Sequence, residues 1–481
     1  MSDHTTSQTI REVASALKGR FRGEILRPGD PGFPEAKSIW NGMVARTPGI
    51  ILRCDNANDV QAAVLISAGV GAPTAVRCGG HSLAGFSTCE GGVVIDLSRM
   101  RHIDIDESKR RARVGGGCLL GTIDTATQRV GLAYPAGVVS HTGAAGLILG
   151  GGTGWLTRMY GLSCDNVESV QLVCADGSLV LATERKNADL FWALRGGGGN
   201  FGVVTEFGLR LHPCTSVLLC TAWTLCDNVQ PLLRHWRDNA PQLPDELKWN
   251  ISLTVAPDSP EIPQQLRGCP AASESIVWFG DEERGHRYLD SILKVGDRVG
   301  VSRKMISFLT LQTMADADFP HGARYYTKSG YFYVLEDRSI DLMLAALAEI
   351  PSRKNQIELA FLGGAAGRIR ASETAFGDRC APFILNLLGH WSDPHDDAAN
   401  ITWVRNLFRA LRPHMKKGVY VNFMSGDEND RVSEAYHDSW NRLLEVKKKY
   451  DPTNFFRLNQ NITEFSTART SAPYGSQSRD A

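Results

Sequence analysis

The sequence VRCGGHSLAGF, residues 76–86, places a single histidine, His81, inside a loop bounded by glycines. Glycine lets backbone N–H groups approach an anion closely, and consecutive N–H groups form an anion-binding nest. The loop therefore suits a diphosphate. A phosphate cradle needs no imidazole, so the histidine indicates either a second chemical role or an incidental residue in a tight surface turn.

The composition excludes several classes of function. The 481 residues carry 52 basic and 52 acidic side chains, so the formal net charge is zero and nothing favours nucleic acid or an anionic membrane. The N-terminal residues show neither a signal-peptide pattern nor a spanning segment. Eleven cysteines without CxxC spacing are expected to be free thiols in a reducing compartment. We therefore expect a cytoplasmic protein without a metal site.

The pattern between residues 50 and 182 alternates between strands and helices. A helix at 60–68 follows a capping candidate, Asn56 or Asn58. The β-branched run at 74–76 leads into the His81 loop, which is therefore predicted to lie at the end of a strand. The other predicted elements are strands at 50–52 and 92–97, a hairpin over 103–114, a helix at 122–130 and a hairpin over 167–182 that turns at Asp176 and Gly177.

Residues 137–166, GVVSHTGAAGLILGGGTGWLTRMYGLSCDN, form the most glycine-rich stretch. Each glycine costs about 1 kcal/mol relative to alanine in a helix, so we expect neither a stable helix nor a good strand here. Apolar residues such as Leu147 and Trp155 argue against a solvated linker. Backbone that lies against a large flat molecule is the preferred interpretation.

A second glycine motif resembles a dinucleotide fingerprint. Gly197, Gly199 and Gly202 satisfy GxGxxG. The fingerprint requires a strand, then glycines, then a helix, whereas here a predicted helix at 189–194 precedes the glycines and a strand at 203–211 follows them. The order argues against a nicotinamide dinucleotide site.

After residue 212 glycine becomes rarer and strands alternate with helices, which predicts an antiparallel sheet covered by helices. An aromatic cluster at 325–333 could be core or could line a substrate cavity. At the C-terminus, the amides of residues 459–461 follow two phenylalanines and need a hydrogen-bonding partner if buried. Predicted strands are 218–225, 276–279, 357–363 and 383–389, and predicted helices are 229–238, 283–295, 340–350, 398–411 and 434–450.

Four motifs occur in an order that resembles the berberine bridge enzyme-like group of FAD-linked oxidases, in the vanillyl-alcohol oxidase superfamily. Bacterial members similar to 6-hydroxynicotine oxidase share this layout. The similarity covers about residues 45–212 and 418–465. The motifs are the His81 loop, the glycine run with YGL at 160–162 and DN at 165–166, GNFGVVT at 199–205, and YDPTNFFRLNQN at 450–461.

The resemblance implies an α+β fold with two lobes: a PCMH-type FAD-binding domain and an inserted antiparallel-sheet substrate domain covered by helices. The implied boundaries are 1–211 for the FAD-binding domain, with its core at about 45–212, then 212–418 for the substrate domain, 419–465 for a C-terminal segment that completes the FAD-binding domain, and 466–481 for a polar tail.

The resemblance also implies roles for individual residues. His81 matches the histidine that bonds covalently to the flavin 8α-methyl group. Many members have a second attachment through a cysteine, but Val139 occupies that position, which implies a single link. Thr142 falls near the position thought to control oxygen access. The implied FAD-binding residues are Arg77, Cys78, Gly79, Gly80, Ser82, Gly85, Val139, Thr142, Gly143, Gly146, Gly150, Gly151, Gly202, Val204, Asn422 and Asn459.

The implied activity is removal of a hydride from a substrate C–H next to oxygen or nitrogen to flavin N5, with reoxidation by O₂ or another acceptor. Tyr420 is the first candidate for the base. A phenol has an ordinary pKa near 10, so it needs a cationic neighbour such as Lys328 or Arg324, or else Tyr420 only orients the substrate. The alternatives are a dehydrogenase that does not use O₂, a non-redox cyclisation, a nicotinamide dehydrogenase and a binding module. Neither the substrate nor the oligomeric state is encoded in a motif.

Overall fold

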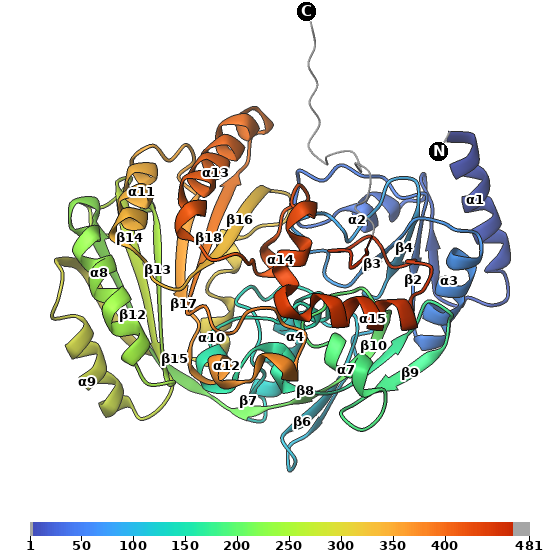
Figure 1. Ribbon diagram of the computed structural model, residues 1–481, viewed down its shortest axis with the longest axis horizontal. Helices are drawn as coiled ribbons and strands as arrows, with labels where there is room; N and C mark the ends of the chain where they lie inside the picture. The colour runs from blue at the N-terminus through green and yellow to red at the C-terminus, as the bar shows by residue number, and fades with distance from the viewer. Residues whose placement is uncertain (1–2, 465–481) are drawn as a thin grey trace, which may run out of the picture.

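The computed structural model describes residues 3–464 and has two lobes, with a seven-stranded sheet in one and three smaller sheets in the other (Figure 1). The arrangement confirms the predicted α+β fold, because strands and helices are mixed in both lobes. The predicted polar tail, residues 466–481, lies outside the described residues. Among the helices of residues 3–464, none combines the length and apolar composition needed to cross a membrane.

The His81 loop follows the last residue of strand β3 (Thr74–Arg77), which belongs to a small sheet near the N-terminus. This sheet has the order β1-β2-β4-β3, in which β2 and β3 run parallel to β4 and β1 is antiparallel to β2. Asn56 caps the adjoining helix α3, because its side chain accepts hydrogen bonds from the backbone N–H groups of Asn58 and Asp59. The elements are α1 (Asp3–Ala16), β1 (Glu24–Leu26), α2 (Phe33–Lys37), β2 (Ile50–Arg53), α3 (Ala57–Gly69), β3 (Thr74–Arg77) and β4 (Val93–Asp96).

A five-stranded antiparallel sheet follows, in the order β5-β6-β10-β8-β9. Both predicted hairpins belong to it, and Gly177 adopts a φ of 76° in the turn between β8 and β9. The second glycine motif lies between helix α7 and strand β10, as its sequence order predicted. The elements are β5 (Ile103–Asp106), β6 (Arg111–Gly115), α4 (Leu120–Gln128), β8 (Val167–Val173), β9 (Leu179–Ala182), α7 (Ala188–Ala193) and β10 (Val203–Arg210), with β7 (Leu132–Ala133) and β11 (His212–Pro213) paired separately.

The glycine-rich run corrects one expectation. Instead of remaining irregular, it contains the helices α5 (Ala144–Leu149) and α6 (Thr157–Tyr160). The buried residues Ala144, Ala145, Ile148 and Leu149 anchor α5 in the core of the first lobe. Burial of these side chains thus outweighs the cost of the glycine inside the helix, which is the usual way that tertiary packing overrides propensity.

The seven-stranded sheet is antiparallel throughout, in the order β15-β12-β14-β13-β17-β18-β16. Helices α8, α9, α11 and α13 contribute to the same hydrophobic core as its strands and cover one face (Figure 1). Strands β13, β15 and β16 were not predicted. The elements are β12 (Ser216–Leu225), α8 (Val229–Asn239), β13 (Leu247–Val255), β14 (Pro270–Trp278), α9 (Glu282–Ile292), β15 (Arg298–Ser307), α10 (Phe308–Thr313), β16 (Arg324–Phe332), α11 (Asp337–Ala348), β17 (Gln356–Phe361), α12 (Gly364–Arg368), β18 (Phe383–Trp391) and α13 (Asp397–Leu411).

The aromatic cluster at 325–333 belongs mainly to the core. Tyr325, Tyr326, Tyr331 and Phe332 are each at most 1% exposed, whereas Tyr333 is 51% exposed. These side chains therefore stabilise β16 and its neighbours rather than line a substrate cavity.

The C-terminal segment returns to the first lobe, and its predicted helix at 434–450 is broken in two. Helix α14 (Val432–Tyr436) and helix α15 (Trp440–Tyr450) are separated by a 3₁₀ turn in which His437 has a positive φ of 45°. Lys447 of α15 donates hydrogen bonds to the carbonyl oxygens of Asn200 and Phe456 and to the carboxylate of Asp451. The segment is thereby fixed beside the second glycine motif.

Candidate functional site

A cavity of about 400 Å³ lies where the two lobes meet. Its walls come from the His81 loop, the glycine-rich run, the second glycine motif, strands β16 to β18 and the C-terminal segment. Segments that are more than 300 residues apart in the sequence therefore share one site. Its size is within the range of small-molecule and cofactor sites.

Most of the predicted cofactor-binding residues line this cavity, as does the candidate base Tyr420. Those that do so are Cys78, Gly79, Gly80, His81, Ser82, Val139, Thr142, Gly143, Gly146, Gly202, Val204, Asn422 and Asn459.

Arg77, Gly85, Gly150 and Gly151 do not line the cavity but support it from behind. The Arg77 guanidinium donates a hydrogen bond to the carbonyl oxygen of Ala36, and burial lowers its pKa. The N–H of Gly85 donates to the carbonyl oxygen of Ser82 at 3.0 Å and closes the loop.

Gly150 and Gly151 leave room for neighbouring side chains. A β-carbon at Gly150 would collide with the amide of Asn422, and one at Gly151 would meet the ring of Phe376. Gly151 also has a φ of 118°, which glycine tolerates best.

The two glycine-containing loops approach each other so closely that no side chain fits between them. A β-carbon on Gly79 would collide with the backbone of Gly143, and one on Gly143 would collide with the backbone of Gly79. Glycine is therefore required at both positions by sterics. The result is a narrow cradle of backbone in the cavity wall.

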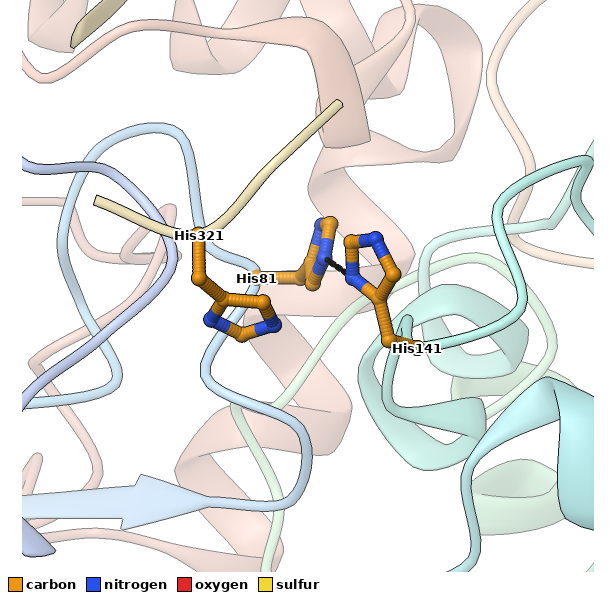
Figure 2. Close-up of side chains that lie close together, drawn as sticks. All are labelled: His81, His141 and His321. Atoms are coloured by element: carbon orange, nitrogen blue, oxygen red, sulfur yellow. Dashed lines mark hydrogen bonds between the residues drawn. The ribbon is translucent and has the colours of Figure 1, made fainter. Parts of the chain in front are cut away.

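His81 is held on two sides, by Trp40 and by His141, and Figure 2 shows the His141 side. Its imidazole stacks on Trp40 with a centroid separation of 4.5 Å and an interplanar angle of 19°. Its Nε2 lies 2.6 Å from Nδ1 of His141, a separation at which one nitrogen donates a proton and the other accepts it. Burial lowers the pKa of His81 well below its ordinary value, and His141 and His321 add to the effect. His81 is therefore neutral near pH 7 and keeps a lone pair.

Three imidazoles, those of His81, His141 and His321, form a cluster that the sequence did not indicate. One ring nitrogen from each lies within 4.8 Å of the others, a spacing that a metal ion could bridge. His321 is exposed, whereas the other two are partly buried. Sequence reasoning expected no metal site and did not single out His141 or His321, because neither belongs to a spaced ligand motif.

The hydroxyl of Tyr420 lies in a network of donors. Its oxygen accepts hydrogen bonds from the N–H of Gly152 and from the amide of Asn422, each at 2.9 Å. Burial raises the pKa of Tyr420 far above its ordinary value, and these donors oppose that shift only in part. Tyr420 therefore retains its proton near neutral pH.

The two cations named from the sequence as possible neighbours of Tyr420 pair with carboxylates instead. Lys328 donates to Asp427 at 2.9 Å, and Arg324 forms a two-point ion pair with Asp397 at 2.5 Å. The prediction that either of them activates Tyr420 was wrong, because each already pairs with a carboxylate. Only the folded chain shows these partners, since they lie 99 and 73 residues away from the cations.

The amides near the cavity are satisfied only in part. Asn459 donates to the carbonyl oxygens of Gly199 and Phe456, but its side-chain oxygen has no partner among residues 3–464. The side-chain oxygen of Asn386 is in the same situation. Buried acceptors without a partner are costly, so these two atoms fit a ligand that donates hydrogen bonds.

Glu358 is the acidic residue that sequence reasoning missed. It lies in the middle of β17, faces the cavity and accepts a hydrogen bond from the Asn386 amide at 2.6 Å. Burial raises the pKa of Glu358, and the Asn386 hydrogen bond opposes that rise. The sequence does contain two features that could have indicated this pair. Glu358 is an acidic residue in the predicted strand at 357–363, and Asn386 is a polar residue in the apolar predicted strand at 383–389.

The position implied for the second flavin attachment holds valine rather than cysteine. Val139 lines the cavity at the position where relatives are implied to carry cysteine. Cys164 does not line the cavity, and burial together with the neighbouring Asp165 raises its pKa well above the ordinary value. Cys164 is therefore held as a thiol behind the glycine run. Thr142 lines the cavity, and its N–H donates to the carbonyl oxygen of Val139 at 3.1 Å.

Comparison with known families identifies both halves of this site. A family model described as FAD binding domain matches residues 48–183, and one described as berberine and berberine like matches residues 419–463. The first match includes the His81 loop and the glycine-rich run. The second match is the segment that carries Tyr420, Asn422 and Asn459.

Individual relatives match over nearly the whole chain. An FAD-linked oxidoreductase of Dictyostelium discoideum is 31% identical over 461 residues, which cover 95% of this chain and 97% of that protein. (R)-6-hydroxynicotine oxidase of Paenarthrobacter nicotinovorans is 29% identical and covers 92% and 97%, respectively. The crystal structure of 6-hydroxy-D-nicotine oxidase from Arthrobacter nicotinovorans has a TM-score of 0.82 at 28% identity, covering 92% of this chain and 98% of that chain. BBE-like 1 of Physcomitrella patens shares the fold, with a TM-score of 0.84 at 23% identity and coverage of 94% and 99%.

Proposed function

Because this chain belongs to the berberine bridge enzyme-like FAD-linked oxidoreductases, we propose that it oxidises a small organic substrate at a C–H bond next to oxygen or nitrogen. When bound, FAD accepts the hydride at flavin N5 and passes the electrons to O₂, giving H₂O₂, or to another acceptor. The observation that carries the proposal is the pair of polar side chains, the Glu358 carboxyl and the Tyr420 hydroxyl, that face the same cavity as His81.

The protein residues hold the cofactor in three ways. The cradle around Gly79 and Gly143 binds the diphosphate through backbone N–H groups, and Asn459 offers an unpaired acceptor to the ring system. His81 attaches covalently to the 8α-methyl group. Val139 cannot form a thioether, so the attachment through His81 is single. The covalent bond prevents loss of the cofactor.

Two residues divide the acid–base work. Tyr420 was our candidate base, but its oxygen already accepts two hydrogen bonds and it keeps its proton, so it orients the substrate by donating its own O–H. Glu358 accepts the substrate O–H or N–H proton. Its raised pKa makes the carboxylate a better proton acceptor than an exposed glutamate, and Asn386 holds it in place.

The wall around Glu358 limits the substrate class. Strands β16 to β18 contribute Thr327, Glu358, Asn386 and Leu388 to the cavity, and the C-terminal segment adds Phe423. One acidic group and one amide among apolar side chains fit a partly apolar molecule with a single hydroxyl or amine. Alcohols, cyclic amines and polycyclic natural products meet this description better than highly hydroxylated sugars.

The test is anaerobic reduction of the flavin by a panel of such compounds, followed as loss of the oxidised flavin absorbance. For a compound that reduces the flavin, we expect Glu358→Gln to slow reduction by about 100-fold and Tyr420→Phe by at least about tenfold, the usual effect of losing a positioned proton acceptor or donor. Equal rates for Glu358→Gln and wild type would remove Glu358 from the mechanism.

The same experiment separates the remaining alternatives. A product lighter by two hydrogens supports oxidation, whereas a product of unchanged mass supports a non-redox cyclisation. Formation of H₂O₂ on admission of air supports an oxidase. Slow reoxidation in air, with fast reoxidation by an artificial acceptor, supports a dehydrogenase.

A further inference from the structure

We propose that His141 positions and deprotonates His81 for covalent attachment to FAD, so that Nδ1 of His81 is the atom that forms the bond. The inference rests on the function proposed above. His141 lies in the glycine-rich run, 60 residues from His81, and it is a positioning residue, since it acts on the cofactor only through His81.

The first argument is the geometry of the two rings. Nε2 of His81 faces Nδ1 of His141 at 2.6 Å (Figure 2). Trp40 stacks against His81 and fixes the plane of its ring. A neutral imidazole carries one proton. If that proton is on Nε2 of His81 and is donated to His141, the lone pair of His81 is on Nδ1 and is free to act as a nucleophile.

The second argument concerns the direction of proton transfer. The carboxylate of Asp316 is anchored beside His141, because it accepts hydrogen bonds from the N–H of Ser140 at 2.7 Å and from the Ser140 hydroxyl at 2.5 Å. Burial lowers the pKa of His141, but the Asp316 carboxylate and backbone oppose this, whereas burial and both neighbouring histidines all lower the pKa of His81. His141 is therefore the more basic of the two rings, and it takes the Nε2 proton of His81 when Nδ1 of His81 reacts.

The attachment step balances as follows. Nδ1 of His81 would form a bond to the 8α carbon as one C–H bond of the 8α-methyl group breaks. The C–H proton would pass to the reduced flavin, and the Nε2 proton of His81 would pass to His141. The two electrons of the broken C–H bond reduce the isoalloxazine ring. O₂ then takes these two electrons and two protons and becomes H₂O₂, which returns the flavin to its oxidised form.

The three-histidine cluster has a competing interpretation. A metal ion could be held between His81, His141 and His321. Such an ion would occupy a lone pair of His81, and attachment would then depend on His321 as much as on His141. The two interpretations therefore differ in what the removal of His321 does.

The test uses the full chain produced under riboflavin limitation and then mixed with FAD. Covalent flavin is measured over time in acid-precipitated protein, and total bound flavin is measured separately in the native protein. We expect His141→Ala to slow covalent attachment at least tenfold while total FAD binding persists, and added imidazole to restore part of the rate. In wild type, NMR of the flavin peptide should show linkage through Nδ1.

His321→Ala is the matched control. It removes an imidazole whose ring lies 4.8 Å from that of His141 and 5.7 Å from that of His81 but which takes no part in the 2.6 Å contact. It should attach FAD at the wild-type rate. His141→Asn covers the case in which the alanine variant does not fold, because its side-chain oxygen can still accept a hydrogen bond from Nε2 of His81 but cannot take the proton. It should bind FAD and attach it slowly.

Three results would overturn the inference: attachment at the wild-type rate in a folded His141 variant, linkage through Nε2, or equal slowing by His321→Ala. Failure of the underlying proposal would look different. In that case wild type itself would bind FAD and release all of it into acid.

Discussion

At the scale of single residues, the site contains buried polar groups whose hydrogen-bonding capacity the protein does not fully use. Asn459 and Asn386 each keep a buried oxygen without a partner among residues 3–464, and Glu358 keeps a carboxyl group in an apolar wall. Each of these features costs stability in the protein alone. Their occurrence together around one cavity is what a site built for a polar ligand requires.

Glu358 gives a prediction of stability against pH. Its folded-state pKa is raised above the unfolded value of about 4.3, so the native state binds the proton more tightly and loses stability as pH rises through the folded-state pKa. Glu358→Gln removes this loss and keeps a partner for Asn386. We expect the flavin-free variant to melt at a higher temperature than wild type near pH 7, and the difference to shrink as pH falls towards about 4.

Thermal melting monitored by tryptophan fluorescence across this pH range measures the effect. Glu349→Gln is the control, because Glu349 is exposed at the end of α11, and it should leave the melting temperature unchanged. A stabilisation by Glu358→Gln that did not depend on pH would show that the carboxyl titration is not its cause.

At the scale of elements, a buried ion pair ties the loop before β18 to the end of the glycine-rich run. Both side chains of the Arg379–Asp165 pair are at most 3% exposed, and the two short contacts are 2.6 and 3.0 Å. Arg379 also donates to the carbonyl oxygen of Ala366 and to the hydroxyl of Thr374. The pair thus holds an element of the second lobe against the wall of the FAD site.

Removal of both partners should cost less stability than the two single removals added together. Arg379→Met leaves the Asp165 carboxylate buried without its cation, so we expect a loss of about 3–5 kcal/mol in the free energy of unfolding. The double variant Arg379→Met with Asp165→Asn should lose less than the sum of the two single losses. Urea denaturation measures all three values.

An exposed pair provides the comparison. Arg370 and Glu373 are joined at 2.7 Å, but the Arg370 side chain is 81% exposed. Arg370→Met should therefore change the stability by less than about 1 kcal/mol. Additive losses in the Arg379 double variant would mean that the pair is not energetically coupled.

At the scale of the whole molecule, the cofactor site is assembled from three distant parts of the chain. The His81 loop, the glycine-rich run and the C-terminal segment each contribute cavity walls, and Lys447 secures the last of them to the carbonyl of Asn200 at 2.8 Å. The seven-stranded sheet has its own core. Binding of FAD should consequently stabilise the first three parts together.

Hydrogen–deuterium exchange of the flavin-free and FAD-loaded protein tests this coupling. We expect faster exchange in the flavin-free protein at residues 76–86, 137–154 and 455–462, because these segments lose the ligand that joins them. Strands β13 and β14 should exchange equally in both forms, since their pairing does not involve the cavity. Uniform protection along the chain on FAD binding would contradict the picture of a locally assembled site.

The sequence by itself determined the local features of this protein. The cap at Asn56, the turn at Gly177, the strand before His81 and the order of helix, glycines and strand around Gly197 are all present in the structure. Backbone preferences and the spacing of apolar residues act over a few positions, so a pattern can report them. The ordered motifs likewise sufficed to identify the family.

Only the tertiary structure decided the rest. Helix α5 forms despite its glycine because its apolar side chains are buried, and β16 is a strand because β18 lies beside it. His141 meets His81 across 60 residues, and Glu358 reaches the cavity from a lobe that carries no recognisable motif. Such contacts depend on how whole elements pack, and the free energy that fixes this packing is distributed over many buried side chains rather than encoded at the residues that finally meet.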